Sequence, residues 1–325
     1  VLFRSEAVVS GEISKSALIS EAETLFIPWQ MFLLSWPSLT KQLRHIERQR
    51  SDKLQVGELS KRSGSKGATP YRLIDRYIRA QHFLVANGQF KQNAFNGALR
   101  GRSVEQAVAT IEGHFGIDRA EFWGKPTKER AFEYLVARIE SGQVNVALGT
   151  SEARLVPSSK NHRSLYKNVS GFCLRSAKVP FAFVHMNMDD EEEPAGRRIY
   201  TLVMLVTLIG LSIYTVTRDW RPGRTRTGKE GEYFQAVHAI VSEFLFPQSS
   251  LQRYRPRRIT TDVIKEITDR HKITPTAAAY RLWKEKVITR EERDALVTPA
   301  VNVKKRARRS EEHTSELQSH SFISY

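Results

Sequence analysis

The sequence is poor in cysteine, and it has fewer acidic than basic residues. Cys173 is the single cysteine among 325 residues, so no internal disulfide can form and we expect a reducing, cytoplasmic compartment. No histidine lies near Cys173 in the sequence to activate its thiol, so we expect a small buried residue on a strand. The 35 Asp and Glu stand against 51 Lys and Arg, which gives a formal net charge of +16. This excess favours a polyanionic partner such as nucleic acid or an anionic membrane surface.

Several common signatures of enzymes are also absent from the sequence. It has no glycine-rich phosphate loop, no Walker motif and no nucleophile elbow. The chain starts at Val1 without a signal-peptide pattern, so we expect a truncated N-terminus, with residues 1–19 disordered or foreign. We expect 298–325 to be a basic disordered tail, and within it Ser310–His320 resembles the translation of a sequencing adapter.

The longest apolar stretch runs from Ile199 to Val216, eighteen residues without a charge. A helix that is apolar on all sides must be buried, either in protein or in lipid. About 17–25 apolar residues cross a bilayer, so a single membrane span through 199–216 is one interpretation. Threonines and a glycine interrupt the run and basic sequence surrounds it, which favours a buried helix in a globular core. We therefore predict the buried helix and keep the membrane span as the alternative.

Elements on both sides of this stretch have recognisable patterns. Phe181–His185 is a short apolar run that predicts a buried strand. The acidic stretch Asp189–Glu193 precedes the apolar helix, where carboxylates meet the positive end of a helix dipole. Further along, Glu232–Pro247 predicts a second helix that ends at the proline.

Four short motifs, taken in order, are similar to the ImmA/IrrE family of metallo-endopeptidases. They are Ser170-Gly171-Phe172, Pro180–Val184, Arg198–Leu202 and Glu243–Pro247, against the family patterns SGF, PF.FV, R.IFTL and EFL.P. The resemblance implies a zincin-like core with a small sheet and two packed helices. Members of this family cleave repressors in phage, mobile-element or stress-response regulation.

The resemblance does not extend to the catalytic motif. It places Met204, Leu205 and Leu208 where the family has the His, Glu and second His of its zinc motif. In that motif two histidines at i and i+4 bind zinc, and the Glu takes a proton from the metal-bound water. Leucine offers no donor atom, and Met sulfur is a soft ligand suited to Cu(I). The family's third ligand falls near Phe234, with Glu232 two residues away. We therefore expect no catalytic residue, no metal ligand and no cofactor.

A rearranged zinc site is the enzymatic alternative. It would use His185 and His238, the histidines nearest to the zincin-like core, together with Glu232 or Glu243. Only in that case would zinc be a cofactor of this chain.

Residues 54–86 have the outline of a helix-turn-helix. A short helical segment is followed by a turn rich in Gly and Ser, and Thr69 and Pro70 then begin a second helix. That helix would present Arg72, Arg76 and Arg79 to DNA. A helical hairpin that does not bind DNA has the same outline, so both interpretations stay open.

A second helical hairpin is predicted near the C-terminus. Thr260 or Thr261 can cap a helix that runs to His271, and Thr274 and Pro275 open the next. It resembles the small helical tail of ImmA/IrrE proteins, and either DNA binding or packing would explain it. The basic residues that precede it and that we consider for nucleic-acid contacts are Arg257 and Arg258.

Together these observations predict an α+β, mainly helical protein. We expect an N-terminal helical region at 20–122, a zincin-like domain at 123–255 and a helix-turn-helix-like hairpin at 256–297. The predicted function is that of a proteolytically inactive ImmA/IrrE-like regulator that binds a repressor-like protein partner or DNA. The alternatives are an active zinc metallo-endopeptidase with a rearranged site, and a membrane protein with a single span through 199–216.

Overall fold

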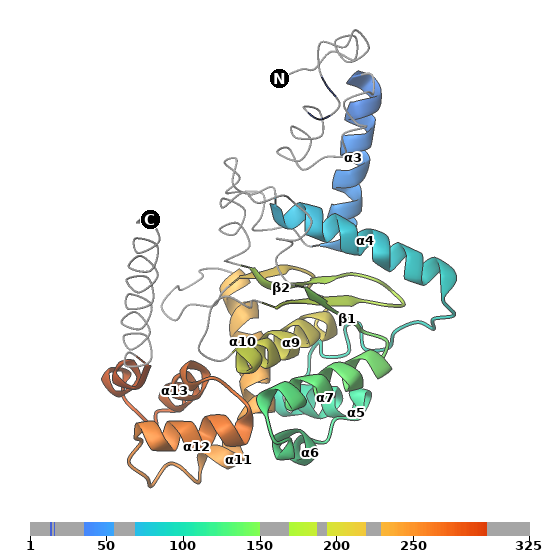
Figure 1. Cartoon of the computed structure of the whole chain (residues 1–325). Helices are drawn as coiled ribbons and strands as arrows, with labels where there is room; N and C mark the ends of the chain where they lie inside the picture. Colours follow the sequence, from blue (N-terminus) through green and yellow to red (C-terminus); the bar gives the residue numbers. More distant parts are fainter. Residues whose placement is uncertain are drawn as a thin grey trace, which may run out of the picture.

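The computed structural model describes residues 14, 16, 36–54, 69–149, 169–186, 194–218 and 229–297. This part of the chain is α+β and mainly helical, as predicted (Figure 1). Its mixed sheet has the order β1-β3-β2-β4, in which β1 is parallel to β3 while β2 is antiparallel to β3 and β4. The strands are β1 (Asn145–Gly149), β2 (Val169–Leu174), β3 (Phe181–His185) and β4 (Val216–Arg218).

Five of the helices begin where the sequence supplies a capping side chain. Ser103, Asp118, Thr127, Thr260 and Thr274 each accept a hydrogen bond from a backbone N–H in the first turn of the helix that follows. The helices are α3 (Trp36–Lys53), α4 (Thr69–Asn87), α5 (Val104–Phe115), α6 (Arg119–Gly124), α7 (Lys128–Ser141), α9 (Pro194–Gly210), α10 (Lys229–Leu245), α11 (Gln248–Leu251), α12 (Thr261–His271) and α13 (Pro275–Lys284).

The sheet is buried on both faces, with α4 on one side and α9 on the other (Figure 1). Successive side chains of a strand point to opposite faces, so Phe181 and Phe183 of β3 join the α4 side while Ala182 and Val184 join the α9 side. Every residue of β3 is buried as a result, which confirms the strand predicted at Phe181–His185.

A buried glutamine ties α4 to the sheet. Gln81 is fully buried, and its Nε2 donates to Val179 O at 3.0 Å and to Leu174 O at 3.4 Å. Leu174 is the last residue of β2, and Val179 lies in the connection between β2 and β3. The amide therefore fixes where α4 crosses the sheet.

The apolar run from Ile199 to Val216 is not one helix. It is the core of α9 only as far as Gly210, after which Ser212 takes the left-handed conformation (φ 56°) and the chain turns back into β4. The helix packs against α7, α10, β2 and β3, so the predicted buried helix is confirmed. The single membrane span through 199–216 is wrong, because the chain reverses inside the run. Within the described residues, none of the helices has both the length and the apolar character needed to cross a bilayer.

Cys173 lies on β2 and is fully buried, as predicted. Its Sγ lies 3.4 Å from Ile213 O, to which the thiol donates. Burial raises the pKa of this thiol to about 12, since the thiolate would have to form without solvent. Cys173 is therefore a core residue and not a nucleophile.

The predicted domain boundaries stay predictions. Contacts cross the boundary placed at 122/123, because α4 covers the sheet and α5 packs on α10. The predicted helical segment before residue 63, the acidic stretch 189–193, and the two terminal regions 1–13 and 298–325 lie outside the described residues.

Gly171 of β2 lies against both β3 and α9. A Cβ atom at Gly171 would lie 2.3 Å from Phe183 O and 3.0 Å from Leu205 Cδ1. The carbonyl belongs to the neighbouring strand and cannot move away without disturbing the β2–β3 ladder. The glycine of the SGF motif therefore has a packing role.

We predict that Gly171→Ala lowers the free energy of unfolding by roughly 3 kcal/mol, because an added methyl group in a packed core forces the backbone apart. Urea denaturation measures this change. The matched control is Gly113→Ala on the exposed side of α5, where a Cβ meets nothing within 4 Å and where alanine should be neutral or stabilising. Equal effects at the two positions would show that β2 does not lie this close to α9.

Candidate functional site

The three positions that the sequence resemblance aligned with a zinc motif lie in the core of the molecule. Met204, Leu205 and Leu208 of α9 are 5%, 0% and 2% exposed. Leu205 faces the sheet, where its Cδ1 lies close to Gly171. Apolar side chains thus fill the face of α9 that the resemblance assigns to zinc, and none of the three supplies an oxygen or nitrogen ligand.

A hydrogen bond joins α9 to α10 one turn before Met204. The Tyr200 hydroxyl lies 2.6 Å from His238 Nδ1, and the ring of Phe234 lies 6.1 Å from the His238 ring. Burial raises the pKa of Tyr200, so its hydroxyl stays protonated. The contact links two helices inside the core. Glu232 is on α10, but its side chain lies outside the described side chains.

The residues of the alternative zinc site are engaged elsewhere. Glu243 accepts the backbone N–H of Gln248 at 3.2 Å and pairs with Arg281 at 2.7 Å, while His185 is buried on β3. Across the described part of the chain, no group of three or more His, Cys, Asp or Glu residues lies close enough to hold a metal ion. The structure does not bring His185, His238 and Glu243 together.

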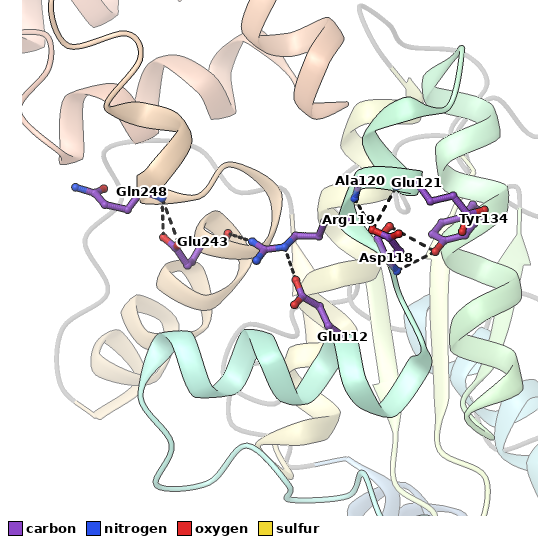
Figure 2. A network of polar contacts seen from close by, with 8 residues as sticks. All are labelled: Glu112, Asp118, Arg119, Ala120, Glu121, Tyr134, Glu243 and Gln248. Atoms are coloured by element: carbon purple, nitrogen blue, oxygen red, sulfur yellow. Dashed lines mark hydrogen bonds and ion pairs between the residues drawn. The ribbon is translucent and has the colours of Figure 1, made fainter.

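Glu243 instead belongs to a polar network that links α10 and α11 to Arg119 and Glu112 (Figure 2), and its pair with Arg281 extends this network to the C-terminal hairpin. Arg119 at the start of α6 pairs with Glu112 of α5, and its Nη1 donates to Glu243 O at 3.4 Å. The Glu243–Arg281 pair is largely buried, with the two side chains 17% and 12% exposed. The Glu of the EFL.P motif therefore has a structural function, which is to cap α11 and to hold α13.

The arginines considered for DNA contacts form two separate sets. Arg76 and Arg79 are exposed on α4, whereas Arg72 is on the same helix with its side chain outside the described side chains. Arg257 and Arg258 are exposed before α12, and Arg257 Nη1 pairs with Glu266 at 2.9 Å. The two helices lie at opposite ends of the molecule, with the sheet and α9 between them (Figure 1). The structure does not unite the five arginines in one surface.

A pocket of about 330 Å³ lies where four separate segments meet. The end of α3 contributes Asp52 and Lys53, and the connection between β2 and β3 contributes Arg175. Leu54 adjoins Lys53, and Ser176 and Ala177 follow Arg175. Residues 92–100 and the turn after α9 supply the rest of the lining: Gln92, Asn96, Arg100, Ser212 and Tyr214. Three cationic side chains thus surround one small cavity.

Hydrogen bonds hold the frame of this pocket. Asn96 Nδ2 donates to Ser176 O at 2.9 Å, and Asn96 Oδ1 accepts from the Tyr214 hydroxyl at 2.7 Å. Arg100 Nε donates to Leu211 O at 3.1 Å, beyond the end of α9. The backbone N–H of Arg175 donates to Lys53 O at 3.0 Å. These bonds tie together segments that are far apart in the sequence and give the pocket a defined shape.

The electrostatics of the pocket are positive. Partial burial lowers the pKa of Lys53; Asp52 opposes this shift and the charge of Arg175 adds to it. On α4, burial lowers the pKa of His82, and Lys53 adds to the effect. Burial is the largest cause of both shifts, and the like charges of Arg175 and Lys53 add to it, so an anion entering the pocket would relieve this smaller, repulsive part.

Sequence reasoning missed this pocket. Lys53 belongs to a charge-dense segment typical of a solvated helix, and Arg100 and Arg175 each lie in a short stretch that contains a second basic residue, Arg102 or Lys178. No motif or spacing connects Lys53 with Arg175, because 121 residues of the chain lie between them. The two residues meet only in the folded structure.

Comparisons with known proteins find no relatives. No protein-family model, no curated protein and no solved structure matches the chain.

A histidine at the end of α12 is buried against aromatic rings. His271 is fully buried, 4.6 Å from the ring of Phe246 and 5.0 Å from that of Trp123. Burial, with a smaller effect of Arg270, lowers its pKa from 6.5 to about 4. The folded protein therefore keeps this imidazole neutral at pH values where the unfolded chain binds a proton.

We predict that this histidine destabilises the protein in acid. Because its pKa is lower in the folded state, stability is unaffected above pH 6.5, falls as the pH drops from 6.5 to 4, and loses nothing further below 4. The loss is on the order of 3 kcal/mol. Urea unfolding at pH 7 and pH 4 should show a smaller acid loss for His271→Phe, which keeps an aromatic ring. The exposed control His45→Gln should behave as wild type. Equal losses for all three proteins would contradict the prediction.

Proposed function

We propose that the chain is a zincin-like protein of the ImmA/IrrE type that does not cleave peptides and acts by binding. Its partner is DNA or a DNA-bound regulator, in regulation of phage, mobile-element or stress-response type. The proposal rests first on the short motifs around α9, whose residues have clear packing roles. Gly171 allows β2 to approach α9, and Glu243 caps α11.

The observation that carries the inactive part of the proposal is the burial of Met204, Leu205 and Leu208. A hydrolytic zinc site needs two imidazoles on one helical face and a carboxylate beside the metal-bound water. Here the same face of α9 is apolar and packed in the core. A metal placed there would meet hydrocarbon and one thioether, which zinc binds poorly.

The binding part of the proposal is supported by the distribution of charge. The net charge is +16, and exposed basic residues cover α3 and α4, including Arg44, Arg48, Arg76 and Arg79. Phosphate groups of a duplex attract such a surface without the need for base contacts. The C-terminal hairpin α12–α13 has a helix-turn-helix outline, yet Arg281 and Gly196 pack it on the core. For this reason we place the DNA contact on the α3–α4 side.

We predict that the purified chain contains no stoichiometric zinc and has no chelator-sensitive peptidase activity. Elemental analysis by mass spectrometry and cleavage of an unfolded protein substrate measure the two properties. A matched comparison is the triple variant with Met204→His, Leu205→Glu and Leu208→His, which restores the motif on α9. One zinc per wild-type chain, with proteolysis that a chelator abolishes, would overturn the inactive assignment and favour the enzymatic alternative.

We predict that duplex DNA is retarded by the chain in an electrophoretic assay and that the affinity falls steeply with salt. The slope of log K against log salt is negative, and each lost phosphate contact reduces its magnitude by about 0.9. The double variant Arg76→Gln with Arg79→Gln should reduce the magnitude of this slope by about 2, as expected for two lost contacts. The charge-matched variant Arg257→Gln with Arg258→Gln should leave it unchanged. The reverse result would move the contact to the C-terminal hairpin, and no retardation at low salt would refute DNA binding.

A further inference from the structure

The pocket between α3, the β2–β3 connection and the turn after α9 has an uncompensated charge. Lys53, Arg100 and Arg175 line it together with the single carboxylate of Asp52, which leaves an excess of two positive charges. Placing like charges around one cavity costs free energy unless something negative occupies it. The charge pattern therefore points to an anionic ligand.

Packing explains only one of these three cations. Arg100 donates to Leu211 O, a carbonyl just beyond the C-terminus of α9, where a positive charge is favourable. Arg175 uses its backbone N–H to hold Lys53 O and leaves its side chain exposed beside the cavity. Lys53 is partly buried in this positive environment. The hydrogen bonds that hold the frame of the pocket do not require the side chains of Lys53 and Arg175. These two side chains are the ones that an anion would need.

The lining also restricts the kind of anion. Besides the charged residues it consists mostly of amides and hydroxyls, with Leu54 and Ala177 as apolar members. Tyr214 is 3% exposed, and its hydroxyl donates to Asn96. A planar base would find no open aromatic face on which to stack. At about 330 Å³ the cavity admits a small group and not an extended chain.

We propose that this pocket binds a phosphate monoester in its dianionic form. Two negative charges on the ligand match the excess of two positive charges, and a guanidinium fork is suited to two phosphate oxygens. Such a group occurs on small phosphorylated molecules and at the 5′-phosphorylated end of a nucleic-acid strand. Neither source depends on the proposed function, because the residues that line the pocket include none of Met204, Leu205 and Leu208 and neither of Arg76 and Arg79.

Isothermal titration of the full chain at pH 7.5 tests this proposal, with methyl phosphate as the probe. We expect saturable binding with one site per chain. Dimethyl phosphate, which carries one charge, should bind at least tenfold more weakly. Lys53→Met and Arg175→Gln should each weaken methyl phosphate binding at least tenfold. The control Arg130→Gln on the exposed side of α7 should stay within twofold of wild type.

A fourth variant separates loss of the site from loss of the fold. Asp52→Asn removes the carboxylate of the pocket and should tighten methyl phosphate binding severalfold, an outcome that damage to the structure does not produce. Absence of saturable binding by the wild type, equal binding of the two phosphate esters, or full binding by both Lys53→Met and Arg175→Gln would overturn the proposal.

A competition experiment then identifies the source of the phosphate. A short oligonucleotide with a 5′-phosphate that displaces methyl phosphate, while its 5′-hydroxyl counterpart does not, assigns the pocket to a strand end. Displacement by neither assigns it to a small phosphorylated molecule. Displacement by both shows that the pocket does not distinguish a monoester from a phosphodiester, which contradicts the proposal. A failure of duplex retardation would leave these results unchanged, so the two proposals fail separately.

Discussion

The burial of α9 on all sides is the constraint on which the rest of the structure depends. From Ile199 to Gly210 the helix has no charged side chain, and nearly all of its residues are buried. A helix of this kind is stable in water only when other elements cover its whole circumference. The sheet, α7 and α10 supply that cover, and the turn between α12 and α13 closes on Gly196 near its N-terminus. The position of each of these elements follows from the need to cover α9.

Polar contacts between the packed layers then determine how the elements meet. Gln81 fixes α4 on the sheet, the Tyr200–His238 bond joins α9 to α10, and Glu243 with Arg281 docks the C-terminal hairpin. Each lies where leaving a polar group without a partner would be costly, so each specifies one arrangement of apolar surfaces that could otherwise slide. Hydrophobic burial supplies the stabilisation, and these contacts supply the geometry.

Under the function proposed above, the same packing would compensate for the loss of a zinc site. Met204, Leu205 and Leu208 stand where a related peptidase would carry two imidazoles and a carboxylate, and their apolar side chains add to the core, which favours the fold. The proposed binding then depends on the basic surface of the protein. The basic face of α3 and α4 and the cation-lined pocket are both consequences of this charge, the first spread along helices and the second concentrated by the sheet.

The local structure of this chain could be predicted from its sequence because it depends on neighbouring residues. Thr127 caps α7, Thr274 and Pro275 begin α13, and the unbroken apolar run at Phe181–His185 is a strand covered on both faces. The sequence by itself also determined that Ile199–Gly210 is buried, since no charge interrupts this part of the chain. Only the tertiary structure decided where, within the apolar run from Ile199 to Val216, the helix ends. Apolar residues fit the inside of a helix or of a strand equally well, and pairing with β2 makes Val216–Arg218 a strand. Only the tertiary structure brought Lys53, Arg100 and Arg175 together. The interaction between charges depends on their distance in space, and this distance leaves no pattern along the chain.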